Sequence, residues 1–373
     1  MQMITWLILP IVCVIAVAVY LYRKVAAAVR CFLPGWENKK QRITALIIEL
    51  LLILPAIRIY GIWFIILLHL TVFLLISDAV IAVVKRIRKI KELGKTGNRI
   101  YRSGVVAMIL TAIVIVYGRY NIFNVVRTEY TVQTQKYIRE DGYRLVLLSD
   151  LHYGVSMNDE QLQKVVDRIN DEHADIIVLD GDIVDESTTE KQMQSAFRIL
   201  GQADSTYGIY YVYGNHDKND YSSTPNYTVE QLADTIRQSG IHILEDETSI
   251  INDEIALIGR ADRGDGNADR KDVLDLIDGL DTNMEWIVLD HQPSEYDNVE
   301  NAGADLILSG HTHAGQIWPA GVFATLFHFD ELNYGEKQQE NLHAIVTSGI
   351  AGWGYPIRTE KHSEYVVINI MPE

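Results

Sequence analysis

Cysteine is scarce in this chain, which has two cysteines among its 373 residues, Cys13 and Cys31. Both lie close to the N-terminus, so no disulfide can form within the long remainder of the chain. Internal repeats and low-complexity segments are also absent from the sequence. Stability must therefore come from ordinary hydrophobic cores, and the length suffices for two or three domains.

Acidic residues are scarce too, but only in one part of the chain. Residues 1–119 contain 16 Lys and Arg against four acidic residues: Glu37, Glu49, Asp78 and Glu92. The remainder holds the other 17 of 33 basic and 45 of 49 acidic residues, a net charge of −28. One part of the chain is therefore basic and apolar, and the other is strongly acidic.

Long apolar runs fill the first part, at approximately 4–22, 43–57, 59–84 and 104–122. The first run has no charged residue and is long enough to cross ~30 Å of hydrocarbon at about 1.5 Å per helical residue. A cleavable signal peptide is the alternative, but no Lys or Arg precedes this run and further runs follow it. We expect residues 1–119 to form a transmembrane region of about four helices.

The charges between these runs predict an orientation. The first and third connections contain six and eight basic residues, whereas the second contains only Arg58. The positive-inside rule places the first and third connections in the cytoplasm. Four spans would then put everything after a linker at 120–142 outside, in a multi-pass protein of the cell membrane. If the short run 43–57 dips into the bilayer without crossing, the topology changes.

From Tyr143 onward, short apolar runs alternate with helical patterns. The expected strands are Arg144–Leu148, Asp175–Leu179, Gly208–Tyr213, Ile255–Gly259, Glu285–Leu289, Asp305–Leu308, Leu342–Thr347 and Tyr365–Ile370. The expected helices are Glu160–Asp171, Thr188–Leu200, Val229–Ser239, Lys271–Leu280 and Pro293–Asn301. This alternation predicts a layered α/β domain over residues 143–373, with helices on both faces of its sheet.

Polar clusters follow five of the expected strands. They supply carboxylate, amide and imidazole groups from Asp150 and His152, Asp182, Asn215 with His216 and Asp217, His291, and His311 with His313. Each cluster alone is explained by turn residues that cap a strand. Five in succession, each with a metal-binding atom type, predict a metal site at the strand ends. Oxygen and imidazole ligands without thiolates suit Mn, Fe or Zn.

The motifs Asp-x-His, Gly-Asp, Gly-Asn-His-Asp, a lone His after a strand, and Gly-His-Thr-His occur in this order. They resemble those of the calcineurin-like metallophosphoesterase superfamily over roughly 143–370, and most resemble a bacterial subgroup with an N-terminal membrane anchor. The resemblance implies a two-sheet α/β sandwich flanked by helices, with two divalent metal ions. One metal would take Asp150, His152 and His313. The other would take Asn215, His291 and His311, with Asp182 bridging both.

The same resemblance assigns catalytic roles. His216 would face the substrate phosphate, and Asp217 would hold its imidazole ring. A hydroxide held by the metals would then attack phosphorus, with His216 stabilising charge or protonating the leaving group. Arg358 could bind a substrate phosphate through its guanidinium group, with an ordinary surface ion pair as the alternative.

We expect a phosphodiesterase or pyrophosphatase that acts at the bilayer on a lipid-, envelope- or nucleotide-linked phosphate. A nuclease or nucleotidase is one alternative, but the charge of −28 argues against nucleic acid as a partner. A membrane scaffold that binds metal without turnover is the other alternative. The complete ligand set and His216 argue against it, because a scaffold does not need an imidazole that faces phosphate.

Overall fold

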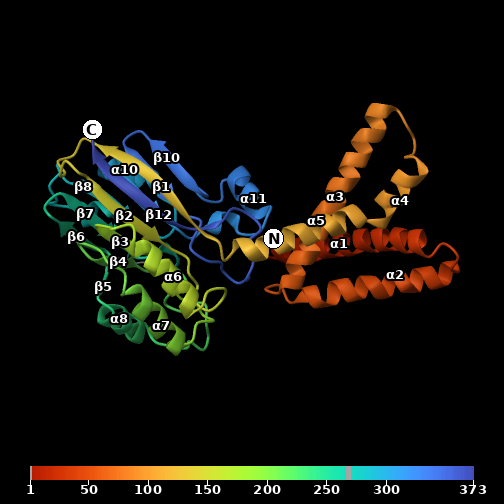
Figure 1. Cartoon of the computed structure of the whole chain (residues 1–373), viewed down its shortest axis with the longest axis horizontal. Helices are drawn as coiled ribbons and strands as arrows, with labels where there is room; N and C mark the ends of the chain where they lie inside the picture. Colours follow the sequence, from red (N-terminus) through yellow and green to blue (C-terminus); the bar gives the residue numbers. More distant parts are fainter. Residues whose placement is uncertain (1, 266–269) are drawn as a thin grey trace. The chain divides into compact units, whose positions relative to one another are not determined.

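A computed structural model of the chain describes residues 2–265 and 270–373 (Figure 1). The chain divides into two compact units, Met1–Tyr117 and Gly118–Glu373. Each unit has its own architecture and is described separately.

The first unit is helical. Its elements are α1 (Gln2–Phe32), α2 (Asn38–Ile53), the 3₁₀ turn η1 (Leu54–Ile57), α3 (Ile62–Arg88), α4 (Lys95–Ser103) and α5 (Val105–Asn121), whose last turn enters the second unit. Lys24 of α1 pairs with Asp78 of α3, which also accepts a hydrogen bond of 2.8 Å from Tyr101 of α4. These polar contacts hold three of the helices together.

Helix α3 is long and apolar enough to cross a membrane, judged within residues 2–265 and 270–373. Helices α4 and α5 pass the same test only as a pair, with a bend of 47° between them. The four-span arrangement therefore stays a prediction, as do the predicted domain boundaries. Helix α4 was not expected, because its residues are polar and lie in the basic connection before the last apolar run.

The second unit contains two six-stranded sheets. The first has the order β1 (Val125–Thr134), β12 (Ser363–Pro372), β2 (Tyr143–Leu148), β3 (Ile176–Asp180), β4 (Ile209–Val212) and β5 (Ile241–Ile243). The second has the order β10 (Gly335–Gln339), β11 (Leu342–Val346), β9 (Leu306–Ser309), β8 (Glu285–Leu289), β7 (Ile255–Gly259) and β6 (Glu247–Ile251). Strands β2 to β5 run parallel, as do β7, β8, β9 and β11.

Helices cover the outer faces of both sheets. Helices α6 (Asp159–Asn170), α7 (Glu190–Leu200) and α8 (Val229–Gln238) pack on the first sheet, and α9 (Val273–Ile277) and α10 (Tyr296–Ala302) pack on the second. A separate core, which includes Leu145, Val178 and Leu289, fills the space between the sheets. The predicted two-sheet α/β sandwich flanked by helices is confirmed, and its layers can be followed in Figure 1.

The sequence did not predict every element. Strand β1 lies within the expected linker 120–142 and pairs in parallel with β12 from Val125 to Thr134. Its side chains alternate between buried and exposed, so no continuous apolar run marks it. Strands β5, β6 and β10 and helix α11 (Ala320–Phe327) were also not expected.

Candidate metal centre and active site

Side chains from both sheets converge at the carboxyl ends of the strands. The loops after β2, β3 and β4 supply groups from the first sheet, and the loops after β8 and β9 supply groups from the second. Two sets of three side chains have ligand atoms within 4.8 Å of one another: Asp150, His152 and His313, and Asp182, His291 and His311. The structure therefore brings all five polar clusters to one place.

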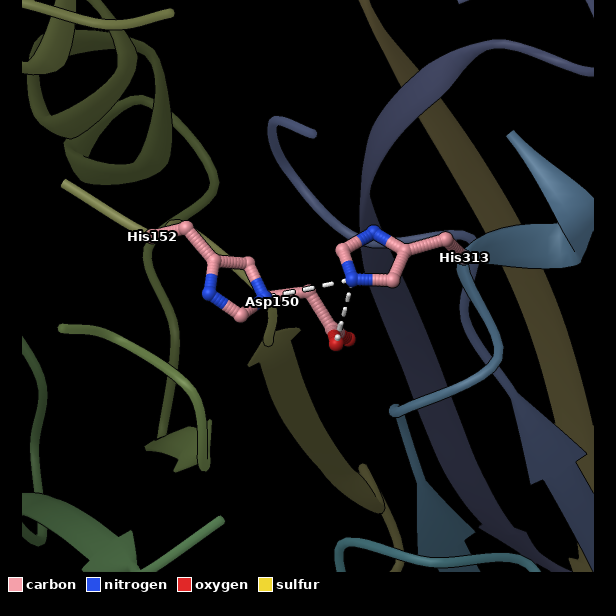
Figure 2. Close-up of side chains that lie close together, drawn as sticks. All are labelled: Asp150, His152 and His313. Atoms are coloured by element: carbon pink, nitrogen blue, oxygen red, sulfur yellow. Dashed lines mark hydrogen bonds and ion pairs between the residues drawn. The ribbon is translucent and has the colours of Figure 1, made fainter. Parts of the chain in front are cut away.

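The first set is buried, with Asp150 and His152 on one loop and His313 opposite them (Figure 2). The Nε2 atoms of His152 and His313 lie 3.2 Å apart, and Nε2 of His313 lies 3.3 Å from Oδ1 of Asp150. Two imidazole nitrogens and a carboxylate oxygen thus face a common point. These atom types fit a divalent cation such as Mn, Fe or Zn.

The second set is oriented by a backbone contact. Nδ1 of His291 donates a hydrogen bond of 2.7 Å to the carbonyl of Asp180, which directs Nε2 towards Oδ2 of Asp182 at 3.2 Å. A backbone acceptor on one ring nitrogen leaves the other nitrogen available to a metal. The amide oxygen of Asn215 lies 2.9 Å from Nδ1 of His311, so Asn215 belongs to this set.

Asp182 lies between the two sets. Its Oδ2 atom is 3.2 Å from Nε2 of His291 and 3.6 Å from Nε2 of His152. Its Oδ1 atom accepts a hydrogen bond of 2.9 Å from the backbone N–H of His216. One carboxylate therefore faces nitrogen ligands of both sets and also fixes the loop after β4.

The pKa shifts of the imidazoles in this region differ from one ring to the next. Burial lowers the pKa of His311 to about 4, with the charge of His291 as the next cause. Burial also lowers the pKa of His313 well below its ordinary value. Burial alone would raise the pKa of Asp182, but the charges of His291 and His152 outweigh it and lower that pKa. Burial alone would lower the pKa of His291, but the charge of Asp182 raises it well above its ordinary value. A cation bound there would displace that proton, because the neutral imidazole is the form that binds a metal.

The backbone at these positions is strained. Five of the seven predicted ligands have positive φ angles between 41° and 69°: Asp150, His152, Asp182, His311 and His313. Non-glycine residues adopt this conformation only when surrounding contacts enforce it, and such residues cluster at functional sites. Gly181 has a φ of +76°, and a Cβ there would lie 2.6 Å from Nδ1 of His291. The loop after β3 thus needs glycine to admit this ring.

His216 lies beside the metal centre and has an unexpected partner. Its Nδ1 atom is 3.0 Å from both carboxylate oxygens of Glu186. The ring also lies 5.3 Å from that of His152 and 5.3 Å from that of Trp353, between ring centroids. Burial alone would lower the pKa of His216, but the hydrogen bond to Glu186 and nearby carboxylates raise it. Glu186 therefore holds this imidazole and favours its protonated form.

Asp217 does not hold the His216 ring, contrary to the role taken from the resemblance. Its carboxylate accepts backbone hydrogen bonds of 2.7–3.1 Å from Asp182, Ile183, Val184 and Gly214. Three of these bonds, from Asp182, Ile183 and Val184, join the loop after β4 to the loop after β3. Asp217 is therefore a positioning residue that fixes the backbone around Asp182.

Arg358 also differs from its predicted role. Its side chain is fully buried and donates hydrogen bonds to the carbonyls of His313, at 2.8 Å, and Ser348, at 2.9 Å. A third donation goes to the carbonyl of Ala351. The guanidinium group thus braces the loop that carries His313 and does not face a substrate phosphate.

Sequence reasoning missed Glu186 as the partner of His216. Asp185 lies 3.4 Å from Nδ1 of His152 through its Oδ2 atom, so it orients that ring. Asp290 instead pairs with Arg260, at 3.1 Å, and with Arg270. The run Asp182–Glu186 carries three acidic residues after one strand, and this density was the available signal.

Comparison with known proteins identifies the family. Residues 143–315 match the family model of the calcineurin-like phosphoesterases. A Danio rerio protein named as a transmembrane protein with a metallophosphoesterase domain is 32% identical over 298 residues, covering 75% of this chain and 64% of that protein. An uncharacterized metallophosphoesterase of Campylobacter jejuni is 30% identical over 236 residues, covering 61% of this chain and 59% of that protein.

Through this domain the chain belongs to the calcineurin-like metallophosphoesterase superfamily. An uncharacterized metallophosphoesterase of Aquifex aeolicus is 28% identical, and the alignment covers 65% of this chain and 90% of that protein. The chain spans less than two thirds of the Danio rerio and Campylobacter jejuni proteins. The relatives include bacterial and animal proteins, so the resemblance is not confined to bacteria.

Proposed function

We propose that this protein is a membrane-anchored phosphoesterase that uses two divalent metal ions to hydrolyse phosphodiester or pyrophosphate bonds. The observation that carries the proposal is the position of Asp182 between two sets of metal-binding side chains, 3.6 Å from His152 and 3.2 Å from His291. A shared carboxylate would allow two cations to lie about 3.5–4 Å apart, the separation of two-metal sites that cleave phosphate esters.

In this proposal Asp150, His152 and His313 would hold one cation, and Asn215, His291 and His311 would hold the other. Asp182 would contribute its carboxylate to both. Bound cations of this kind supply positive charge to the phosphoryl oxygens and acidify a water molecule. The backbone contact of His291 with the carbonyl of Asp180 would keep that ring oriented towards its cation.

His216 acts on the leaving group. Glu186 fixes Nδ1, so the Nε2 edge of the ring is the one available to substrate. A protonated imidazole there stabilises charge on the phosphoryl group or donates its proton to the departing alkoxide. Glu186 supports this step because its carboxylate favours the charged ring.

The substrate that we propose is a lipid-, envelope- or nucleotide-linked phosphate at the membrane. The apolar helix α3 and the paired α4 and α5 support an anchor in the bilayer. The basic residues of the first and third connections between the apolar runs favour a catalytic domain outside the cytoplasm. The charge of −28 in residues 120–373 disfavours a nuclease.

Purified full-length protein assayed with Mn²⁺ on phosphomonoester, phosphodiester, pyrophosphate and oligonucleotide substrates tests this proposal. We expect diester or pyrophosphate hydrolysis, and His216→Ala should reduce turnover by roughly 10²- to 10⁴-fold with unchanged metal content. His242→Ala changes an exposed histidine on β5 and is the matched control. Bound metal without hydrolysis of any substrate would favour the scaffold, and preference for oligonucleotides would favour the nuclease.

The orientation has its own test. Cysteines introduced at Ser222 and Lys39, in a chain without Cys13 and Cys31, should react oppositely with an impermeant thiol reagent in intact cells. We expect labelling at position 222 and none at position 39. The reverse pattern would place the catalytic domain in the cytoplasm.

A further inference from the structure

Helix α11 presents its large apolar side chains outwards. Val322, Phe323, Leu326 and Phe327 have exposed fractions of 51%, 48%, 63% and 60%, and Phe329 just beyond the helix has 71%. The inner side of the helix consists of small residues such as buried Gly321 and half-buried Ala324. Helices on the surface of water-soluble domains have the opposite arrangement, with apolar side chains inwards. We call these five exposed side chains the α11 face.

The α11 face is continuous. The rings of Phe323 and Phe327 stack with centroids 6.1 Å apart, and those of Phe327 and Phe329 stack at 6.0 Å. Isolated exposed apolar residues are common, but a contiguous cluster marks a surface that meets another apolar phase. The α11 face is therefore an interaction surface.

The last turn of α5 lies close to α11 within the second unit, and one chain segment connects them. The backbone N–H of Arg358 donates to the carbonyl of Gly118, at 3.0 Å. Thr359 then accepts from the N–H of Trp318 and Glu360 accepts from the N–H of Gly321, both at 2.9 Å. Residues 358–360 thus contact both helices, and Figure 1 shows α11 at the end of the second unit where α5 terminates.

The last turn of α5 has the composition of a membrane–water boundary. Tyr120 is 66% exposed, and the neighbouring Arg119 is also exposed, with its guanidinium group over the ring of Phe123. Tyrosine is enriched where transmembrane helices leave the hydrocarbon, and basic side chains commonly flank such positions. The α11 face therefore lies beside the point at which the chain would emerge from a bilayer.

We propose that α11 inserts the α11 face into the lipid bilayer beside α5, as an interfacial helix. Such helices bury their apolar face by about 5–10 Å at the boundary of headgroups and acyl chains. Helix α11 begins soon after His313, and Arg358 ties the loop of that ligand to the same segment. The metal centre would thus be held near the headgroups, and its substrate would be a phosphoester carried by a lipid; this second part rests on the proposed function.

Spin labels test the insertion independently of activity. Val322→Cys and, as a control, Leu274→Cys would be made in full-length protein whose native cysteines are replaced by serine. Leu274 lies on α9 and is 57% exposed, similar to Val322. In nanodiscs of phosphatidylcholine and phosphatidylglycerol, the label at 322 should be more accessible to oxygen than to a polar nickel chelate, and the label at 274 should show the reverse. Equal chelate accessibility at both positions would overturn the proposal.

A second copy of the chain is the other possible occupant of the α11 face. In that case labels at 322 would broaden each other's spectra, and dilution with unlabelled protein would remove the broadening. That result would also overturn the proposal.

Activity tests the consequence for substrate choice. The double variant Phe323→Ser/Phe327→Ser should hydrolyse a water-soluble nitrophenyl diester within about twofold of the wild-type rate, because neither ring belongs to the metal centre. Hydrolysis of a phosphodiester lipid in the nanodisc should fall on the order of tenfold, since apolar area is lost from the membrane contact. If the double variant hydrolysed the lipid as fast as the wild-type protein does, the lipid assignment would be refuted. Wild-type protein inactive on every ester would refute the proposed function, while the label accessibilities would still decide the insertion.

Discussion

Glu186→Gln removes the charge that faces His216 and keeps the shape of the side chain. Unit charges about 4 Å apart interact by roughly 4 kcal/mol at an effective dielectric constant of ~20. The His216 and Glu186 side chains are 15% and 23% exposed, so water screens part of this interaction. If the activation free energy rises by about 1.4 to 2.8 kcal/mol after this screening, turnover falls 10- to 100-fold.

The assay compares kcat and KM for an alkyl phosphodiester and a nitrophenyl phosphodiester with Mn²⁺. The alkyl ester should lose more activity, because its poor leaving group needs the proton of His216, whereas KM should change little for either ester. Glu186→Asp should recover part of the loss, and Glu160→Gln, at an exposed residue of α6, is the matched control. If Glu186→Gln and Glu160→Gln had the same kcat while His216→Ala was inactive, the supporting role of Glu186 would be refuted.

Asp182→Asn should weaken binding at both metal positions, whereas His152→Ala should weaken mainly one; metal analysis of the purified variants measures this, and two full equivalents in Asp182→Asn would contradict the bridging role. Asp217→Asn should lower the melting temperature by several degrees, because an amide N–H₂ would face backbone donors and leave buried groups unsatisfied at a cost of about 1–3 kcal/mol each. Glu285→Gln should stabilise the fold at pH 8 but not at pH 4. Burial raises the pKa of Glu285 to about 7 in the folded chain. The contribution of Glu285 to the free energy of unfolding is therefore greatest at low pH, and it falls by up to about 3 kcal/mol as the pH rises from about 4.5 to 7. Melting curves at the two pH values decide this, and a pH-independent difference would contradict it.

The inner strands of the second unit could be predicted from sequence because both of their faces are buried. The bounds of β7 and β8 match the expected Ile255–Gly259 and Glu285–Leu289. Their neighbours at the sheet edges could not be found in this way. The sequence of β10, Gly-Glu-Lys-Gln-Gln, contains no apolar residue, and it forms a strand because its backbone pairs with β11. Whether such a segment forms a strand depends on its pairing with a neighbouring strand, and its own apolar pattern does not reveal this.

The metal centre was more predictable than its supporting contacts, for a physical reason. Parallel strands end at the same edge of a sheet, so groups placed after successive strands must meet there, whichever helices intervene. Asp150, Asp182 and Asn215 followed this rule. The partner of an imidazole depends instead on the path of a loop, and several carboxylates compete for each ring. Asp217 was the nearest candidate for His216 in sequence, but four backbone N–H groups already occupy its oxygens.

Arg358 is a second residue whose role depends on the path of nearby loops. A guanidinium group near a predicted phosphate site suggests substrate binding, because its geometry matches phosphate. The fold gives this side chain three backbone carbonyls in a fully buried position, one of them belonging to the metal-ligand candidate His313. Moving it to substrate would leave those carbonyls unsatisfied, and that cost exceeds the gain from one additional phosphate contact. In the proposed mechanism, the positive charge that faces phosphate would come from the bound cations and from His216, whose charged form the contact with Glu186 favours.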